Sequence, residues 1–442
     1  MVESKLAIPP APGKTRFLRA PCCSPSIAIC VVAALLAGGC TSLSPLRPNS
    51  EKNPQNSVVT QDGYKIAFIE FGEQGSYQDP TQLQNALGLI RQMEKPFVIT
   101  YVHGWQNNAE SGDVINFESL LARFNKAPAI RGAGFSVVGV YLAWRGKLTP
   151  IPGLEQLSFW NRKNTAERLA SNYDCFDAIA SISEEARKHD KQYTVLLGHS
   201  FGGLIVERSV AHAINAEIHG RAPDPNRSMP ADLMLAVNPA SDSILARQMI
   251  DALYDRKTEG SRPLFISMTS TGDWATGKFF PIGTGLASVS KGFNTVEAPG
   301  PGDKPVSERK FYTSTPGHNQ MLINHETVDL HQTIDSPRGN PAFETNLEQN
   351  FPGNGFTLNG VGDQLNLWQI QRVGNVDVPY WDIKVDPTII KNHGDLWNPR
   401  AEAMMAALFR MANPIMNRAA KPRATLHRKP ALERLKSPQQ QQ

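Results

Sequence analysis

A serine between two glycines could carry nucleophilic chemistry in this chain. Residues Gly198 to Gly202 read Gly-His-Ser-Phe-Gly, which fits the pattern G-x-S-x-G. A serine in this pattern sits on a tight, strained turn between a strand and a helix, so its neighbours must be small. The turn raises the Ser200 hydroxyl above the sheet, and the helix that follows presents free N–H groups and a positive dipole end. This is the setting that a serine nucleophile needs.

Ser200 would also need a histidine base within hydrogen-bonding reach. The other ring nitrogen of that histidine should be held by a carboxylate, which also stabilises the imidazolium. Three histidines compete for the role, namely His393, His318 and His325. A lone histidine is more often structural, so residue type alone leaves the base open.

The candidates for the carboxylate are Asp273 and Asp242. Each follows a short apolar run that is typical of a buried strand. Either could instead be an ordinary turn or helix-cap aspartate. His103 follows another such run, and we expect it to shape a loop beside the serine rather than to act as the base.

Hydrophobic periodicity predicts the elements that position these groups. Residues 194–197 form an apolar run typical of a buried strand, and the apolar residues from 204 to 214 recur at helical spacing. Strands alternating with helices, with continuous apolar strand runs, predict an α/β fold with a mostly parallel sheet covered on both faces. Further strands are expected over 64–71, 97–104, 135–143, 232–237, 263–269 and 380–385, and helices over 83–93, 117–124, 165–188, 243–254 and 402–411.

The first 39 residues have the features of a signal peptide. A basic, Pro-rich region leads into the apolar stretch Ile27–Leu36, which is short for a membrane-spanning helix. The small residues before Cys40 resemble the lipobox of bacterial lipoproteins, although the usual leucine stands one place early, at Leu36. That resemblance implies lipidation of Cys40 and a membrane anchor. Because Thr41 is not the aspartate associated with inner-membrane retention, it implies an outer-membrane lipoprotein, with secretion as the alternative.

Composition divides the rest of the chain. Residues 40–60 are rich in Ser, Pro and Asn, and we expect a flexible linker there. The main domain should span 61–415. Within it, residues 276–375 break the strand–helix rhythm and predict an insertion before the last strand, which is a candidate lid. Residues 416–442 are basic and then Gln-rich, which favours a disordered tail.

The chain from about 61 to 415 resembles the α/β-hydrolase superfamily, and lipase- or esterase-like members in particular. The resemblance rests on the G-x-S-x-G motif, on His103-Gly104 after an earlier strand, and on an acid and a histidine that follow later strands in that order. It implies a triad of Ser200, Asp273 and His393. It also implies that the backbone N–H groups of Phe201 and Trp105 stabilise the oxyanion.

Several classes of partner are disfavoured. A formal net charge of +4, much of it near the two ends, argues against nucleic-acid binding. Residues 272–278 match G-x-x-x-x-G-K, but Phe279 stands where a P-loop needs Ser or Thr, and Phe-Phe-Pro looks a poor start for a helix, so we expect no nucleotide. No metal-ligand spacing is found, so we expect neither a metal nor a cofactor.

These features together predict a serine hydrolase that cleaves a small-molecule or lipid ester through an acyl-enzyme. Aromatic residues near the motifs suggest an apolar substrate pocket, although they could equally be core. They are Trp105, Trp144, Phe159, Trp160, Trp274, Phe279 and Phe280. The alternative from another class is an inactive envelope lipoprotein that keeps the fold for binding or scaffolding.

Overall fold

The computed structural model describes residues 44–61, 63–147, 155–218, 229–254, 262–297, 305–329, 355–359, 365–373 and 378–413. The predicted signal peptide, Cys40 and the tail over 416–442 lie outside these residues. The described residues from Pro45 onward belong to one compact unit.

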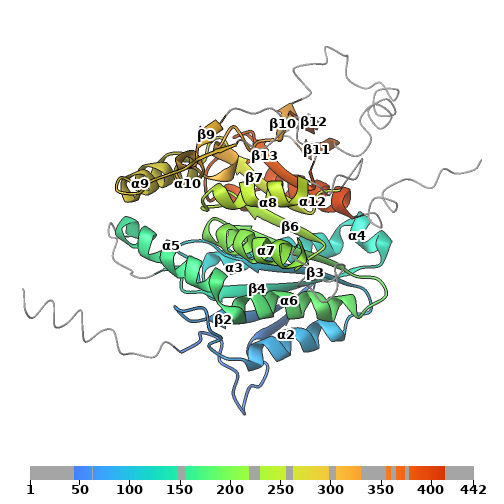
Figure 1. The fold of residues 1–442 in the computed structure, drawn as a ribbon. Coiled ribbons are helices and arrows are strands. Elements are labelled where there is room, and N and C mark those ends of the chain that lie inside the picture. Colours follow the sequence, from blue (N-terminus) through green and yellow to red (C-terminus); the bar gives the residue numbers. More distant parts are fainter. Residues whose placement is uncertain are drawn as a thin grey trace, which may run out of the picture. The chain divides into compact units, whose positions relative to one another are not determined.

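A large mixed sheet, mostly parallel, organises the fold (Figure 1). All pairs from β2 to β10 in its order are parallel, whereas β1 and the two strands beyond β10 pair antiparallel. The 11 strands found among the described residues are, in order across the sheet, β1 (Val58–Gln61), β2 (Tyr64–Phe71), β4 (Ser136–Trp144), β3 (Pro96–Val102), β5 (Tyr193–His199), β6 (Leu233–Val237), β7 (Phe265–Ser270), β13 (Tyr380–Val385), β10 (His325–Asp329), β12 (Leu365–Arg372) and β11 (Gly355–Asn359). A separate ribbon joins β8 (Thr295–Glu297) to β9 (Pro305–Ser307).

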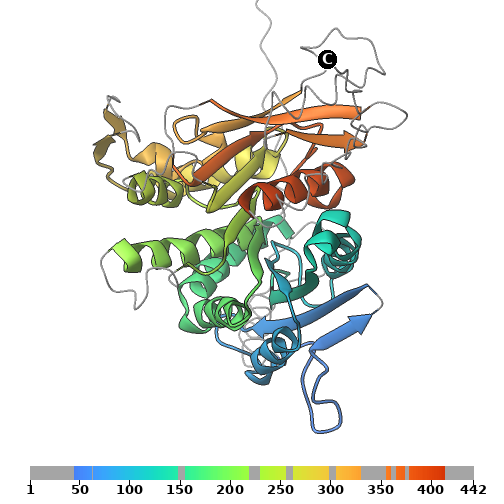
Figure 2. The same ribbon diagram turned by 90° about the vertical axis from the view of Figure 1, so that its right-hand side faces the viewer.

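Helices cover both faces of the sheet, as Figures 1 and 2 show. The central strands β3, β5, β6 and β7 are buried along their whole length because each face packs into a hydrophobic core. One core receives α2 (Thr81–Arg91), α5 (Glu155–Ser171), α6 (Tyr173–Arg187), α7 (Phe201–Ile218), α8 (Ile244–Tyr254), α9 (Phe280–Ala287) and α10 (Arg309–Tyr312). The other receives α3 (Gly112–Lys126), α4 (Pro128–Ala133), the turn η5 (Asp395–Trp397) and α12 (Pro399–Ala412). The predicted α/β fold with a mostly parallel, two-sided sheet is therefore confirmed.

The prediction of a single helix over 165–188 is wrong, because the structure has two helices there. α5 ends at Ser171, and α6 begins at Tyr173. Asn172 between them has extended backbone, and its side-chain oxygen accepts a hydrogen bond from the Asp174 N–H at 2.9 Å. Asparagine caps a helix better than it continues one, so a local cap overrides the longer periodicity.

A second difference concerns the segment after β7. The sequence Phe-Phe-Pro was expected to start a helix poorly, yet a π-helical turn η2 (Ala275–Phe279) runs directly into α9. Pro281 lies in the first turn of α9, where its missing N–H would have no partner in the helix anyway. The insertion predicted over 276–375 thus contains helix, and its described part also extends the sheet beyond β13 through β10, β12 and β11.

The described part of the expected linker over 40–60 makes ordered contacts with the domain. The N–H groups of Leu46 and Arg47 both donate to the Glu70 carboxylate, at 2.8 Å each. The Arg47 guanidinium lies 3.8 Å from the centre of the Phe68 ring. Residues 58–61 form β1, so the domain begins before the expected boundary at 61.

Among the described residues, no helix is long and apolar enough to cross a membrane.

Candidate active site

Ser200 lies on the tight turn that its flanking glycines predict. It has a left-handed φ of 57°, directly between β5 and α7. A Cβ added at Gly198 would come within 2.5 Å of the carbonyl oxygen of Gly202, and one added at Gly202 would come within 1.9 Å of that of Val102. Backbone therefore packs against backbone on both sides of the serine, which leaves no room for larger residues.

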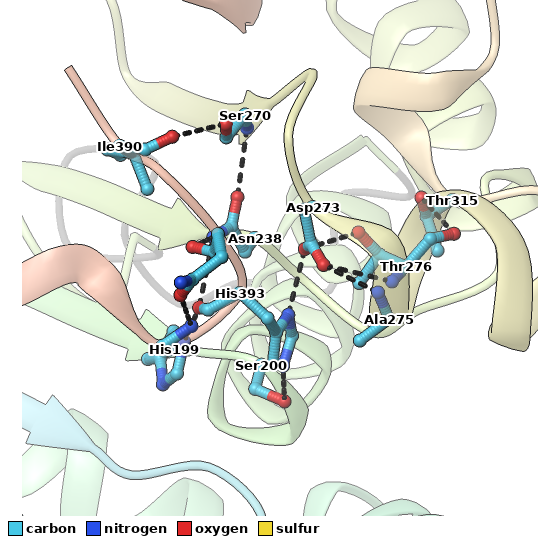
Figure 3. Close-up of polar contacts among 12 residues, drawn as sticks. His199, Ser200, Asn238, Ser270, Asp273, Ala275, Thr276, Thr315, Ile390 and His393 are labelled. Carbon is cyan, nitrogen blue, oxygen red and sulfur yellow. Dashed lines mark hydrogen bonds and ion pairs between the residues drawn. The ribbon is translucent and has the colours of Figure 1, made fainter. Parts of the chain in front are cut away.

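Ser200, His393 and Asp273 meet at the carboxyl ends of the parallel strands (Figure 3). The Ser200 hydroxyl donates to Nε2 of His393 at 2.7 Å, and Nδ1–H of His393 donates to Oδ2 of Asp273 at 2.8 Å. Asp273 follows β7, and His393 follows β13, which pairs with β7 in the sheet. The structure therefore brings together the three residues that the hydrolase resemblance singled out. A hydroxyl, an imidazole and a carboxylate in this relay can transfer a proton away from an attacking oxygen.

Asp273 is surrounded by hydrogen-bond donors. The N–H groups of Ala275 and Thr276 donate to its Oδ1 at 2.9 and 3.2 Å, and the Thr276 hydroxyl donates to its Oδ2 at 2.5 Å. Burial alone would raise the pKa of Asp273, but its hydrogen bond and charge interaction with His393, and the donors from Thr276, together lower the pKa. The carboxylate is therefore ionised and able to orient the imidazole.

Two side chains that sequence reasoning did not assign to the site hold the loop that carries His393 (Figure 3). Nε2–H of His199 donates to the His393 carbonyl oxygen at 2.7 Å, and the Asn238 amide donates to the same oxygen at 3.1 Å. The Asn238 side-chain oxygen in turn accepts from the Ser270 N–H at 2.9 Å. Asn238 thereby ties the end of β7 to the loop after β13.

Asn238 and His199 each have a property that suits this task. Asn238 has a left-handed φ of 45°, which asparagine tolerates better than most residues. Burial, followed by the charge of His393, lowers the pKa of His199 to about 4. His199 is therefore neutral at physiological pH and donates from Nε2. The only signal of Asn238 in the sequence is its position directly after an apolar run.

A glycine-containing loop approaches the nucleophile from β3. A Cβ at Gly104 would lie 2.7 Å from the Ser200 Cβ, so only glycine permits this approach. His103 braces the loop, because its Nε2 accepts from the Trp144 N–H at 3.0 Å and its Nδ1–H donates to the Gly104 carbonyl at 2.9 Å. Burial lowers the pKa of His103, so the ring is neutral. The backbone of Trp105 follows directly.

The competing candidates lie elsewhere or have other partners. Burial lowers the pKa of His318, and the charge of nearby Asp273 partly opposes this shift. The ring that bridges Asp273 and Ser200 is nevertheless that of His393. His325 stacks on Trp381, with ring centroids 4.3 Å apart, on the far side of β13 from β7. Asp242 forms an ion pair with Lys163 at 3.4 Å.

The aromatic residues expected near the substrate pocket differ widely in burial. Trp144 and Phe280 are buried in the core, and Trp105 and Phe159 are half-buried against it. Trp274 and Phe279 are largely exposed beside the site, on the segment that begins after Asp273. Aromatic content alone therefore did not distinguish core from surface.

Comparison of the chain with protein-family models, with curated proteins and with solved structures found no match. Within the described ranges, no group of three or more His, Cys, Asp or Glu side chains is placed to hold a metal ion.

Proposed function

We propose that the protein is a serine hydrolase of the α/β-hydrolase type that cleaves carboxylic esters through an acyl-enzyme. The observation that carries the proposal is the hydrogen-bonded relay from Ser200 through His393 to Asp273, with 2.7 and 2.8 Å separations. The strained turn under Ser200 and the order serine, acid, histidine along the chain support it further.

In the proposed reaction, the Ser200 oxygen attacks the ester carbonyl while His393 Nε2 takes the hydroxyl proton. Asp273 stays ionised and stabilises the imidazolium that forms. The tetrahedral intermediate then collapses as His393 returns the proton to the departing alcohol oxygen. A water molecule, deprotonated by the same imidazole, attacks the acyl-enzyme. The second tetrahedral intermediate collapses as His393 returns this proton to the Ser200 oxygen, and the acid is released.

The negative oxygen of the tetrahedral intermediate needs preorganised donors. We assign the backbone N–H of Phe201, at the start of α7, and the backbone N–H of Trp105, after Gly104. The close approach of Gly104 to Ser200 supports the second donor. Removal of one such donor typically costs about 3 kcal/mol of transition-state stabilisation.

Labelling with a fluorophosphonate probe tests the proposal directly. The folded native protein should be labelled, and Ser200→Ala should not. Ser183→Ala is the matched control, because Ser183 is also a buried serine, it lies on α6, and its hydroxyl has no hydrogen-bond partner in the described part of the chain. Labelling that persists in Ser200→Ala would overturn the assignment of Ser200 as the nucleophile. No labelling of native protein would overturn the proposal and favour an inactive binding or scaffolding role.

The base is tested by comparing two histidines that both lie near Asp273. His393→Ala should abolish turnover of a chromogenic acyl ester, and His318→Ala should keep most of it. The reverse result would show that His318, in the insertion, is the base. A panel of matched ester, thioester and amide substrates separates the proposed ester cleavage from its alternatives.

We also propose that Cys40 is lipidated and anchors the protein to the outer membrane, with secretion as the alternative. The apolar segment and small residues before Cys40 support this. Incorporation of labelled palmitate into the native chain, and its loss in Cys40→Ala, is the expected result.

A further inference from the structure

A stripe of exposed apolar side chains runs along the helix that follows Asp273. Phe279, Ile282, Leu286 and Val289 are between 61% and 73% exposed. Their spacing of three, four and three residues places them on one face of η2, α9 and the turn after it. Single exposed apolar residues are ordinary, but a contiguous row of four large ones marks an interaction surface. We call these four residues the apolar stripe.

The opposite face of the same helix is firmly packed. Phe280 is fully buried, and Thr284 is nearly so. Gly283 lies flat against the indole of Trp160 on α5, where an added Cβ would come within 1.7 Å of the ring. The packing fixes which side of the helix faces outward, so the apolar stripe cannot turn into the core without losing these contacts.

Exposed cations flank the apolar stripe. Lys278 lies over the ring of Trp274 at 3.9 Å, and Trp274 is itself 60% exposed. Lys291 follows the stripe in the sequence and is exposed. Arg309 on α10 donates to the carbonyl oxygen of Gly285 at 3.4 Å, so α10 adjoins the helix (Figure 1). An apolar helix face bordered by Lys, Arg and Trp is the pattern of helices that lie in the surface of a lipid bilayer.

We propose that the apolar stripe docks on a lipid bilayer that carries anionic headgroups. The stripe would lie at the level of the upper acyl chains, with Lys278, Lys291 and Arg309 beside the headgroups. Charge complementarity favours a bilayer over a second copy of this chain, because two copies would bring the same cations together. The helix lies on the bilayer rather than crossing it, since α9 is far too short to span.

Docking would place the site described above at the lipid surface. The first turn of the same helix supplies the donors that hold Asp273, from Ala275 and Thr276. Lipid esters in the bilayer, rather than small esters in solution, are then the substrate class. This second part of the inference rests on the proposed function, whereas the docking itself does not.

Quenching of tryptophan fluorescence by phospholipids brominated on their acyl chains tests the docking. The full chain is bound to vesicles of phosphatidylglycerol and phosphatidylcholine, and one tryptophan is added by Leu286→Trp. Ile115→Trp is the matched control, because Ile115 is 65% exposed on α3, which packs on the other face of the sheet. The two variants differ from the native chain by one residue each, so the comparison reports only the depth of the added ring. We expect the emission added at 286 to be quenched and that added at 115 to be unaffected.

Equal quenching at both positions, or none at either, would overturn the docking. A blue-shifted emission of Leu286→Trp without vesicles, together with a doubled molar mass in sedimentation, would show instead that a second copy covers the stripe. Vesicles of phosphatidylcholine alone should bind the stripe more weakly, and the difference should disappear at high salt.

Rates of ester hydrolysis distinguish a failure of the docking from a failure of the proposed function. Replacing all four residues of the apolar stripe by serine should lower hydrolysis of a bilayer-embedded ester by at least about tenfold, because their burial in lipid is lost. Hydrolysis of a soluble short-chain ester should stay within about twofold, since no residue of the triad or oxyanion loop is changed. If native protein shows the bromolipid quenching but hydrolyses neither ester, the proposed function fails and the docking stands. If the four-serine variant hydrolyses both esters more slowly by the same factor, the lipid-substrate inference fails.

Discussion

Buried carboxyl groups occur in two regions of the molecule, and their surroundings differ. Asp273 follows β7, while Asp382 lies on the neighbouring β13 and Glu207 on α7 above the sheet. All three are nearly or fully buried. Asp273 accepts hydrogen bonds from two backbone N–H groups, a hydroxyl and an imidazole. Its pKa is lowered in spite of burial.

Glu207 and Asp382 have no such set of donors. Burial raises the pKa of each to about 8, and the nearby Asp382 carboxyl adds to the cost of ionising Glu207. The nearby groups are hydroxyls: Ser241 donates to Glu207, and Ser267 stands directly opposite Asp382 in the strand register. No ion pair to either carboxyl forms within the described part of the chain. Depth of burial therefore does not decide whether an acid is ionised here, whereas the donors around it do.

The largest effect should come from removing the charge of Asp273. In Asp273→Asn the amide can no longer stabilise the imidazolium or fix the tautomer of His393, so kcat should fall about 10³- to 10⁴-fold. Steady-state hydrolysis of a chromogenic ester measures this. Asp242→Asn is the matched control, since Asp242 contacts Lys163 rather than His393. Comparable losses in both variants would mean that Asp273 acts only on the fold.

A change of pH should affect stability through Glu207 and Asp382, whose pKa values are raised where that of Asp273 is lowered. Their folded pKa values of about 8 lie above the ordinary values of 4.5 and 3.8, so the native state binds more protons than the unfolded state between about pH 4 and 8. Stability should be greatest below about pH 4 as far as these two groups are concerned. It should decline as the pH rises through 8, by on the order of a few kcal/mol. Urea unfolding midpoints at a series of pH values measure the decline.

The matched variant for the pH series is Glu207→Gln with Asp382→Asn, which keeps both side chains neutral at every pH. The decline between about pH 4 and 8 should flatten in it, because each replaced group no longer releases a proton on unfolding. Asp382→Asn alone should flatten the decline in part. An unchanged pH dependence in both variants would contradict the raised pKa values.

Asn238 should have a smaller, purely positional effect. Without its amide, the His393 carbonyl keeps only the hydrogen bond from His199, so the imidazole is held less well over Ser200. Asn238→Gly keeps the left-handed backbone and should lower kcat by roughly tenfold to a hundredfold with little change in KM or thermal stability. Asn238→Ala adds backbone strain and should also lower the melting temperature. Equal kcat in native protein and Asn238→Gly would show that Asn238 does not position His393.

Thr276 should show the smallest effect in this comparison. Thr276→Val removes one hydroxyl donor from Asp273 but leaves both backbone N–H donors and His393 in place. The pKa of Asp273 should therefore stay low, and kcat should fall only about twofold to tenfold. Thr276→Ser restores the hydroxyl and should restore the rate.

Local features of the sequence were sufficient to predict the strand–turn–helix around Ser200. The pattern needs small residues at two positions and apolar residues before and after them, and each requirement acts over a few residues. The same holds for the apolar strands and for the α/β layering. Local pattern alone did not predict the break at Asn172, where one helix-capping residue interrupts apolar residues that continue at helical spacing.

The sequence by itself thus determined the class of fold, the turn at Ser200 and the short set of acids and histidines that could serve it. The hydrolase resemblance favoured His393 over His318, but only the tertiary structure brought its ring between Ser200 and Asp273, assigned Asn238 and His199 to the loop that holds it, and left the apolar stripe outside the core. Those outcomes depend on contacts between residues more than a hundred positions apart or on which helix face another element covers. Composition and spacing along the chain carry no record of either.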